Sequence, residues 1–204
     1  MNQGPTIFLG VFLTFASAWL GLVVAPYVQL EAQRSQNAAK ADALPETPME
    51  GLAAQGRQVY RANGCVYCHS QQIRPENFGS DIARGWGPRR TVAQDYVGER
   101  PVMLGTMRTG PDLANIGTRQ TSAAWHHLHL FNSRMTSPGS IMPRFAFLYE
   151  QRKIVGQRSS TALTLPSEWD VKPGYEVVPT NQAKALVAYL LAMDRSRPLE
   201  ESGP

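Results

Sequence analysis

Residues 65–69 read Cys-Val-Tyr-Cys-His, and they include both cysteines of the 204-residue chain. This pattern is the attachment signature of a c-type haem. Thiols at this spacing can reach the two vinyl groups of one porphyrin, and the histidine then lies beneath the iron as the proximal ligand. Because proteins that hold haem in this way usually transfer electrons, the motif predicts one covalently bound haem c, held by Cys65, Cys68 and His69, and a redox role.

Two other kinds of site use a Cys-x-x-Cys pair, namely a redox disulfide and a zinc site. A thioredoxin-like disulfide would stand near a βαβ pattern, and none follows this pair. A zinc site needs two more ligands at matched spacing, but the chain has no third cysteine. The downstream residues His126, His127 and His129 are not in a finger-like arrangement either. The complete five-residue match therefore favours haem.

The first thirty residues contain no Asp, Glu, Lys or Arg, and residues 7–24 are apolar apart from Thr14 and Ser17. A hydrocarbon core about 30 Å thick needs about 20 such residues, so the sequence predicts one transmembrane helix that ends near Pro26. The alternative is a cleaved signal peptide with its cleavage site at residues 16–18. This alternative is disfavoured because no positively charged segment precedes the apolar run, which also continues past that site.

The net charge of +4 is a mild basic excess, and the chain has no Lys/Arg-rich tract with interleaved aromatic residues. We therefore expect no nucleic-acid binding. Positive charges do not orient the anchor, because no Lys or Arg precedes it. Covalent c-type haem is attached on the outer face of the bacterial inner membrane, so the haem-binding part of the chain is expected in the periplasm.

Three helices are expected outside the anchor, over residues 48–62, 122–131 and 181–195. Thr47 as N-cap, Pro48 in the first turn and Glu50 at the third position form a capping box for the first of them. Thr180 is the expected N-cap of the last. Residues 70–107 and 150–179 show no clear period and are interpreted as long irregular insertions, with no strands predicted.

The haem iron needs a sixth ligand, and Met142 is the first candidate because it lies in a loop that Pro143 stiffens. Met135 lies in the same loop and is the second candidate. Ligation by His126 or His129 is less favoured, because two histidines three apart on one helix are more often hydrogen-bonded there. A methionine–histidine pair raises the reduction potential relative to two histidines, which suits delivery of electrons to a strong oxidant.

Residues 108–113, Arg-Thr-Gly-Pro-Asp-Leu, are expected on the proximal side of the haem. A neutral proximal imidazole donates its second N–H to a partner that fixes the ring, and a carbonyl in a proline-stiffened turn suits that role. We expect Pro111 to supply this carbonyl and Leu113 to pack against the haem edge. Arg108 is a candidate partner for a haem propionate, because a guanidinium matches a carboxylate.

The order of these blocks resembles a class I cytochrome c, in which the first and last helices cross near Gly56 and Tyr189. The resemblance implies an all-α fold, a class I cytochrome c domain with an N-terminal single transmembrane helix and long irregular insertions. It implies a division into a transmembrane anchor at 1–30, a tether at 31–47, a cytochrome c domain at 48–195 and a frayed tail at 196–204.

A narrower match is to the CcoO/FixO family, the membrane-anchored monohaem subunit (subunit II) of cbb3-type cytochrome c oxidase. The similar blocks are residues 64–75, 108–113, 125–130 and 142–143. The stretch His-Ser-Gln-Gln-Ile-Arg-Pro after the second cysteine is quite specific. The chain departs from the family pattern at residues 84–87 and 132–134, and the insertion at 150–179 has no counterpart that we can map.

The resemblance implies an electron-transfer subunit of an oxidoreductase complex. The subunit itself does not reduce oxygen, which is the task of a partner subunit. The electron-transfer subunit takes electrons from a dihaem cytochrome c subunit and passes them to a polytopic haem–copper subunit. Three alternatives stay open: the monohaem subunit of a nitric oxide reductase, a free membrane-tethered carrier and a haem-based gas sensor. The specific stretch after the motif disfavours the nitric oxide reductase subunit. The long insertions disfavour the free carrier. The sensor would need a signalling domain and an open iron site.

Overall fold

The computed structural model describes residues 3–39, 49–96, 99–169 and 171–198. The chain divides into two compact units, the first made of residues 1–46 and 92–98 and the second of residues 47–91 and 99–204. The second unit is the larger unit. It contains the Cys-x-x-Cys-His motif and the two segments predicted to approach the haem, namely residues 108–113 and the loop with Met142.

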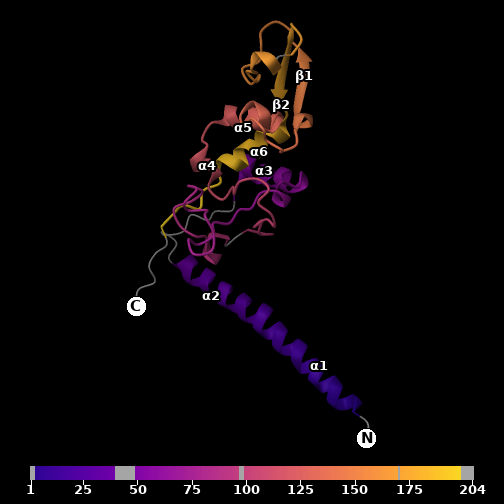
Figure 1. Ribbon diagram of the computed structural model, residues 1–204, viewed down its shortest axis with the longest axis vertical. Helices are drawn as coiled ribbons and strands as arrows, with labels where there is room; N and C mark the ends of the chain where they lie inside the picture. The colour runs from indigo at the N-terminus through magenta and orange to yellow at the C-terminus, as the bar shows by residue number, and fades with distance from the viewer. Residues whose placement is uncertain (1–2, 40–48, 97–98, 170, 199–204) are drawn as a thin grey trace. The chain divides into compact units, whose positions relative to one another are not determined.

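The first unit contains one long helix made of α1 (Gly4–Trp19), a π-helical turn (Leu20–Val24) and α2 (Ala25–Ala39), which follow one another without a break (Figure 1). Within its part from Gly4 to Ala32, the most apolar stretch of 18 residues has a mean hydropathy of 2.3, and none of that stretch is buried. At 1.5 Å per residue these 29 residues extend about 44 Å, more than the roughly 30 Å of a bilayer core. The helix is therefore long and apolar enough to cross a membrane.

The prediction that this helix ends near Pro26 is wrong, because α2 continues to Ala39. A proline has no N–H and its ring clashes with the carbonyl of an α-helical turn before it. Here the turn before Pro26 is π-helical, and the N–H of Ala25 bonds to the carbonyl of Leu20, five residues back. The wider turn lets the helix pass the proline. Residues 40–47, the remainder of the predicted tether at 31–47, lie outside the described residues.

Most of the regular secondary structure in the larger unit is helical, as expected. Its helices are α3 (Gly51–Ala62), α4 (Ile116–Arg119), α5 (Ala123–Phe131) and α6 (Asn181–Leu191). Short 3₁₀ turns cover Cys65–Tyr67, Ser133–Met135, Ala146–Leu148 and Ser167–Trp169. Within the predicted insertion at 70–107, residues 70–91 form only turns and bends, and Ala93–Tyr96 form a short 3₁₀ turn.

Side-chain caps fix the starts of α5 and α6 where the sequence predicts them. Ser122 Oγ accepts the N–H of Trp125, and Thr180 Oγ1 accepts the N–H of Ala183. The predicted cap of α3 is wrong, because that helix begins at Gly51 with Glu50 as its N-cap residue. The other two residues of the predicted capping box lie outside the described residues.

The core of the larger unit lies where α3 packs against α6 (Figure 1). Gly56 allows the close approach, since a Cβ there would lie 1.8 Å from the carbonyl oxygen of Ala185. One turn further along, the rings of Tyr60 and Tyr189 pack with their centroids 5.3 Å apart. The early and last helices thus meet at the residues that the sequence pattern selects.

Two strands, β1 (Tyr149–Lys153) and β2 (Tyr175–Pro179), pair antiparallel in the register Tyr149↔Pro179 to Lys153↔Tyr175. They lie at one end of the larger unit, next to the start of α6 (Figure 1). The prediction of an irregular, strand-free insertion at 150–179 is therefore wrong, and the unit is not purely α-helical. The buried carboxylate of Glu176 in β2 connects this strand to β1 and to the chain between them. It pairs with Arg152 at 2.9 Å and accepts the N–H of Ser159.

Candidate haem site

The Cys-x-x-Cys-His motif begins where α3 ends. Asn63 closes the helix, and Gly64 follows in the left-handed region at φ 68°, which glycine adopts without strain. The chain then forms the 3₁₀ turn, in which the carbonyl of Cys65 accepts the N–H groups of Cys68 at 3.2 Å and His69 at 2.9 Å. The motif is thus wound into one tight turn whose start is anchored to the core helix.

The two cysteines are free thiols. Cys65 is partly buried against the apolar core, and burial raises its pKa to about 11, whereas Cys68 is exposed. Among the described residues, no three His, Cys, Asp or Glu side chains come together as a metal-binding group. Both thiols thus lie on one turn, at the spacing that attachment to a single porphyrin needs.

The ring of His69 is held by the turn at residues 110–111. Its Nδ1 lies 2.7 Å from the carbonyl oxygen of Pro111, which is the contact that the sequence predicts. The backbone of Gly110 packs against the ring, and its N–H donates to the carbonyl of Cys68 at 2.9 Å. Within the described part of the chain, no hydrogen bond involves Nε2 of His69.

The protonation of His69 also suits a metal ligand. Burial lowers its pKa below the ordinary value, although the Pro111 carbonyl and the carboxylate of Asp112 act in the opposite direction. The imidazole is therefore neutral at pH 7. Because a carbonyl can only accept, Nδ1 carries the proton and Nε2 keeps its lone pair.

Leu113 and Arg108 both lie close to this turn but differ in their surroundings. Leu113 packs against the apolar core, and its N–H donates to the carbonyl of Ser70 at 2.8 Å. The guanidinium of Arg108 is engaged by the carboxylates of Asp81 and Asp112. Since protein carboxylates already pair with this guanidinium, we leave Arg108 out of the group of residues proposed to contact haem.

Met142 is partly buried against the same apolar core that Cys65 and Leu113 contact. Its backbone is fixed on both sides, because its N–H bonds to Ser140 Oγ at 3.3 Å and its carbonyl accepts Ser133 Oγ–H at 3.2 Å. Met135 lies in the 3₁₀ turn that includes Ser133. The structure thus brings the first-choice methionine to the core that contacts the haem motif.

The three downstream histidines each have a protein partner. Nε2 of His126 bonds to the carbonyl of Gln120 at 2.8 Å, and Nδ1 of His127 to the hydroxyl of Tyr149 at 3.1 Å. Nδ1 of His129 bonds to Thr136 Oγ1 at 2.6 Å. Burial lowers the pKa of His129 to about 4, with further contributions from His69 and His126.

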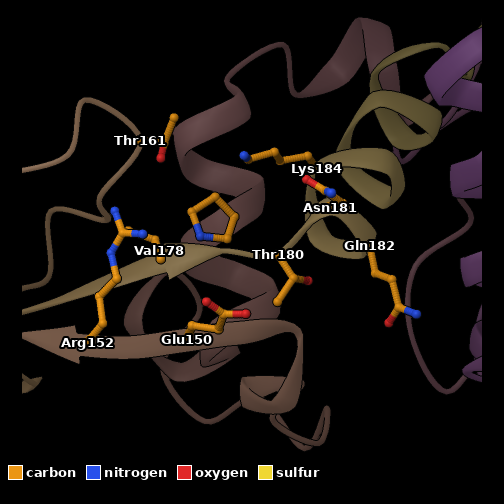
Figure 2. Close-up of a pocket in the computed structure, with 9 residues that line it drawn as sticks. Glu150, Arg152, Thr161, Val178, Thr180, Asn181, Gln182 and Lys184 are labelled. Atoms are coloured by element: carbon orange, nitrogen blue, oxygen red, sulfur yellow. The ribbon is translucent and has the colours of Figure 1, made fainter.

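An open polar pocket of about 480 Å³ lies between the strands and the start of α6 (Figure 2). Its lining comprises Glu150, Arg152, Thr161, Val178, Pro179, Thr180, Asn181, Gln182 and Lys184. None of the predicted haem-site residues lines it. Figure 2 shows Glu150 and Arg152 entering from β1, Val178 from β2, and Asn181, Gln182 and Lys184 from α6. Thr161 and Thr180 enter from the chain between these elements.

The turn at residues 110–112, called the proximal turn, includes two residues that the sequence analysis does not identify. Gly110 was treated only as part of a Gly-Pro turn, yet it is the surface on which the His69 ring rests. Asp112 was not singled out, because an aspartate in a turn is ordinarily exposed. Its position between Pro111 and Leu113, two residues already assigned to the site, was the one available signal.

None of the curated proteins with which the chain was compared matches it. The family model described as cytochrome c oxidase, mono-heme subunit/FixO matches residues 3–186. The match includes the apolar N-terminal helix, the Cys-x-x-Cys-His motif, the turn at residues 110–111 and Met142. The chain therefore belongs to the mono-haem subunit/FixO family of cytochrome c oxidase.

Proposed function

We propose that this chain is the electron-transfer subunit of a cbb3-type haem–copper terminal oxidase. It carries one covalent haem c, takes electrons from a dihaem cytochrome c subunit and passes them to the polytopic subunit that reduces oxygen. Membership of an oxidase subunit family supports this function. So does the apolar helix from Gly4 to Ala32, which can hold the subunit in the membrane beside its partners.

The observation that carries the proposal is the state of His69. Its Nδ1–H is directed to Pro111, its ring rests on Gly110 and its Nε2 has no protein partner among the described residues. This is the arrangement that a proximal haem ligand requires, because the carbonyl that accepts the Nδ1–H fixes the ring and raises the basicity of Nε2. With two free thiols on the same turn, the residues fit a c-type haem.

In the proposed site, Cys65 and Cys68 would hold the haem through thioether links, and His69 Nε2 and the sulfur of Met142 would ligate its iron. The haem supplies reversible one-electron chemistry when bound. Pro111 and Gly110 keep the proximal ring from rotating, and the soft thioether of Met142 favours the ferrous state. The backbone hydrogen bonds on both sides of Met142 hold its loop in place during the redox change.

We infer a class I cytochrome c fold for the larger unit. The packing of α3 against α6 at Gly56 and Tyr189 supports this, together with the order of the motif, the Gly-Pro turn and Met142 between those helices. We also infer that the larger unit is periplasmic and the anchor lies in the bacterial inner membrane. The support for this orientation is that c-type haem is attached on that side of the membrane.

Replacement of the methionine ligand tests the site. We expect Met142→Ala to abolish the thioether-to-iron charge-transfer band of the ferric protein and to lower the reduction potential, because a soft ligand is lost. The matched control is Met135→Ala, which should keep both properties. Loss of the band in the control alone would move the assignment to Met135. If neither variant loses it, another methionine supplies the thioether. If the unmodified ferric protein shows no such band, ligation by methionine is excluded and His129 becomes the candidate.

Purification in a gentle detergent tests the role in the complex. A polytopic subunit with haem and copper should purify together with this chain, and the preparation should consume oxygen with a cytochrome c donor. Recovery of the cytochrome alone with full haem content would support a membrane-tethered carrier. A preparation that reduces nitric oxide but not oxygen would support the nitric oxide reductase alternative.

A further inference from the structure

The carboxylate of Asp112 is completely buried directly beside the proximal turn. Its Oδ2 accepts hydrogen bonds from Ser70 Oγ at 2.6 Å and from the N–H of Gln72 at 2.7 Å. Its Oδ1 accepts the N–H of Ala114 at 2.8 Å. Three donors satisfy the carboxylate within the protein, so this buried group remains as a charged acceptor in the folded state.

These bonds join the two segments that make the proximal side of the site. Ser70 directly follows His69, and Asp112 directly follows Pro111, so the carboxylate ties the chain after the ligand to the chain after its hydrogen-bond acceptor. A second hydrogen bond, from the N–H of Leu113 to the carbonyl of Ser70, connects the same two segments. A break at Asp112 would therefore loosen the position of the Pro111 carbonyl against the His69 ring.

The charge of Asp112 lies close to His69, because Asp112 follows Pro111, whose carbonyl bonds to Nδ1 of the ring at 2.7 Å. Arg108 is a balancing charge, with its Nη2 at 3.8 Å from Asp112 Oδ2, and the same guanidinium pairs with Asp81. The guanidinium of Arg119 lies close as well, because it donates to the backbone carbonyl of Asp112. Arg108 also lies over the ring of Trp86, with 5.6 Å between its guanidinium carbon and the ring centroid, which fixes its place.

We propose that Asp112 is a positioning residue that holds the Pro111 carbonyl on the His69 ring, and that its charge, balanced by Arg108, sets the reduction potential of the haem. This inference rests on the proposed function. Ferric iron carries one more positive charge than ferrous iron, so a nearby carboxylate favours the ferric state and lowers the potential. A nearby guanidinium has the opposite effect, and both act in a medium of low dielectric constant.

Potentiometric titration of the full chain in detergent, matured with haem, separates the charge from the structural role. Asp112→Asn keeps the size and most of the hydrogen bonds but removes the charge, and it should shift the potential upward. Arg108→Gln removes the balancing cation and should shift it downward. The matched control Ser70→Ala removes one hydrogen bond to Asp112 but keeps its charge, and its shift should be much smaller than that of Asp112→Asn.

A purely structural role predicts a different pattern. Both charge variants would then loosen the proximal turn, admit water to the haem and shift the potential in the same direction, with Ser70→Ala following them. That result, or unchanged potentials in both charge variants, would overturn the proposal. If Asp112→Asn yields no folded protein, the test depends on Arg108→Gln. A reduction potential that rises or stays unchanged in that variant is then enough to overturn the proposal. If the unmodified chain binds no covalent haem, it is the proposed function that fails.

Discussion

The ring of His69 and the backbone of Gly110 are in direct contact, with no space for a side chain between them. A Cβ at position 110 would lie 2.3 Å from Cε1 and 2.8 Å from Nε2 of the imidazole. The ring cannot move aside freely, because its Nδ1 is bonded to the Pro111 carbonyl at 2.7 Å. One turn therefore controls both the position and the rotation of the proposed proximal ligand.

We expect Gly110→Ala to displace the His69 ring and to break its bond to Pro111. Overpacking of this kind costs about 1–3 kcal/mol, and the lost hydrogen bond about 1 kcal/mol. The free energy of unfolding in urea should fall by this order, and the low-spin visible spectrum of the haem-loaded chain should change. The control is Gly79→Ala, whose Cβ would meet Arg74 at 3.4 Å, a normal contact distance. Equal losses in both variants would show that the ring contact is not the cause.

Gly56→Ala should destabilise the larger unit by about 3 kcal/mol or more, because the added Cβ would lie 1.8 Å from the carbonyl oxygen of Ala185. Helix propensity alone predicts the opposite sign, a gain of about 1 kcal/mol. Urea unfolding therefore distinguishes the clash from propensity. Ala62→Gly, at an exposed position near the end of the same helix, should cost at most about 1 kcal/mol. A stabilised Gly56→Ala variant would contradict the close packing of α3 on α6.

Local signals in the sequence predicted much of the framework. The starts of α5 and α6 depend on Ser122 and Thr180, whose side chains bond to N–H groups three residues away, so the information lies within one turn. The contact between His69 and Pro111 was also predictable, because the chemistry of a proximal ligand demands a carbonyl and a proline-stiffened turn offers one.

The features that the sequence did not predict depend on residues distant in the chain. The strands pair residues 149–153 with 175–179, and the pairing depends on buried contacts such as the bond from the N–H of Leu163 to the carbonyl of Val177. The burial of Asp112 requires donors from residues 70 and 72, about forty positions earlier. Neither periodicity nor capping patterns carry such information.

Thr180→Ala should lower the free energy of unfolding by about 1–2 kcal/mol, the usual cost of losing an N-cap. The hydroxyl accepts the N–H of Ala183 and also donates to the carbonyl of Leu148 at 2.8 Å, so it joins the start of α6 to the residue before β1. Chemical denaturation measures the loss. Thr180→Ser keeps the hydroxyl and should recover most of it. If the serine variant is as unstable as the alanine variant, the methyl group rather than the cap is responsible.

Acid should destabilise the larger unit partly through His127. Burial lowers the pKa of this side chain from 6.5 to about 4, and His126 and Lys184 contribute in the same direction. Between these two pKa values the unfolded chain binds a proton at His127 that the folded chain does not bind. The free energy of unfolding therefore falls as the pH falls from 6.5 to about 4, and the contribution of neutral His127 is fully present above pH 6.5. Unfolding in urea at several pH values should show this slope.

His127→Gln should reduce the slope between pH 6.5 and 4, although not abolish it, because burial also lowers the pKa values of His126 and His129. Lys184→Gln provides an independent check. Removal of the neighbouring cation should raise the pKa of His127 toward 6.5, so this variant should also lose less stability in acid. A slope that is identical in the unmodified chain and in His127→Gln would mean that His127 is protonated in the folded state. In that case its bond to the Tyr149 hydroxyl, 3.1 Å long, has the imidazolium as the donor.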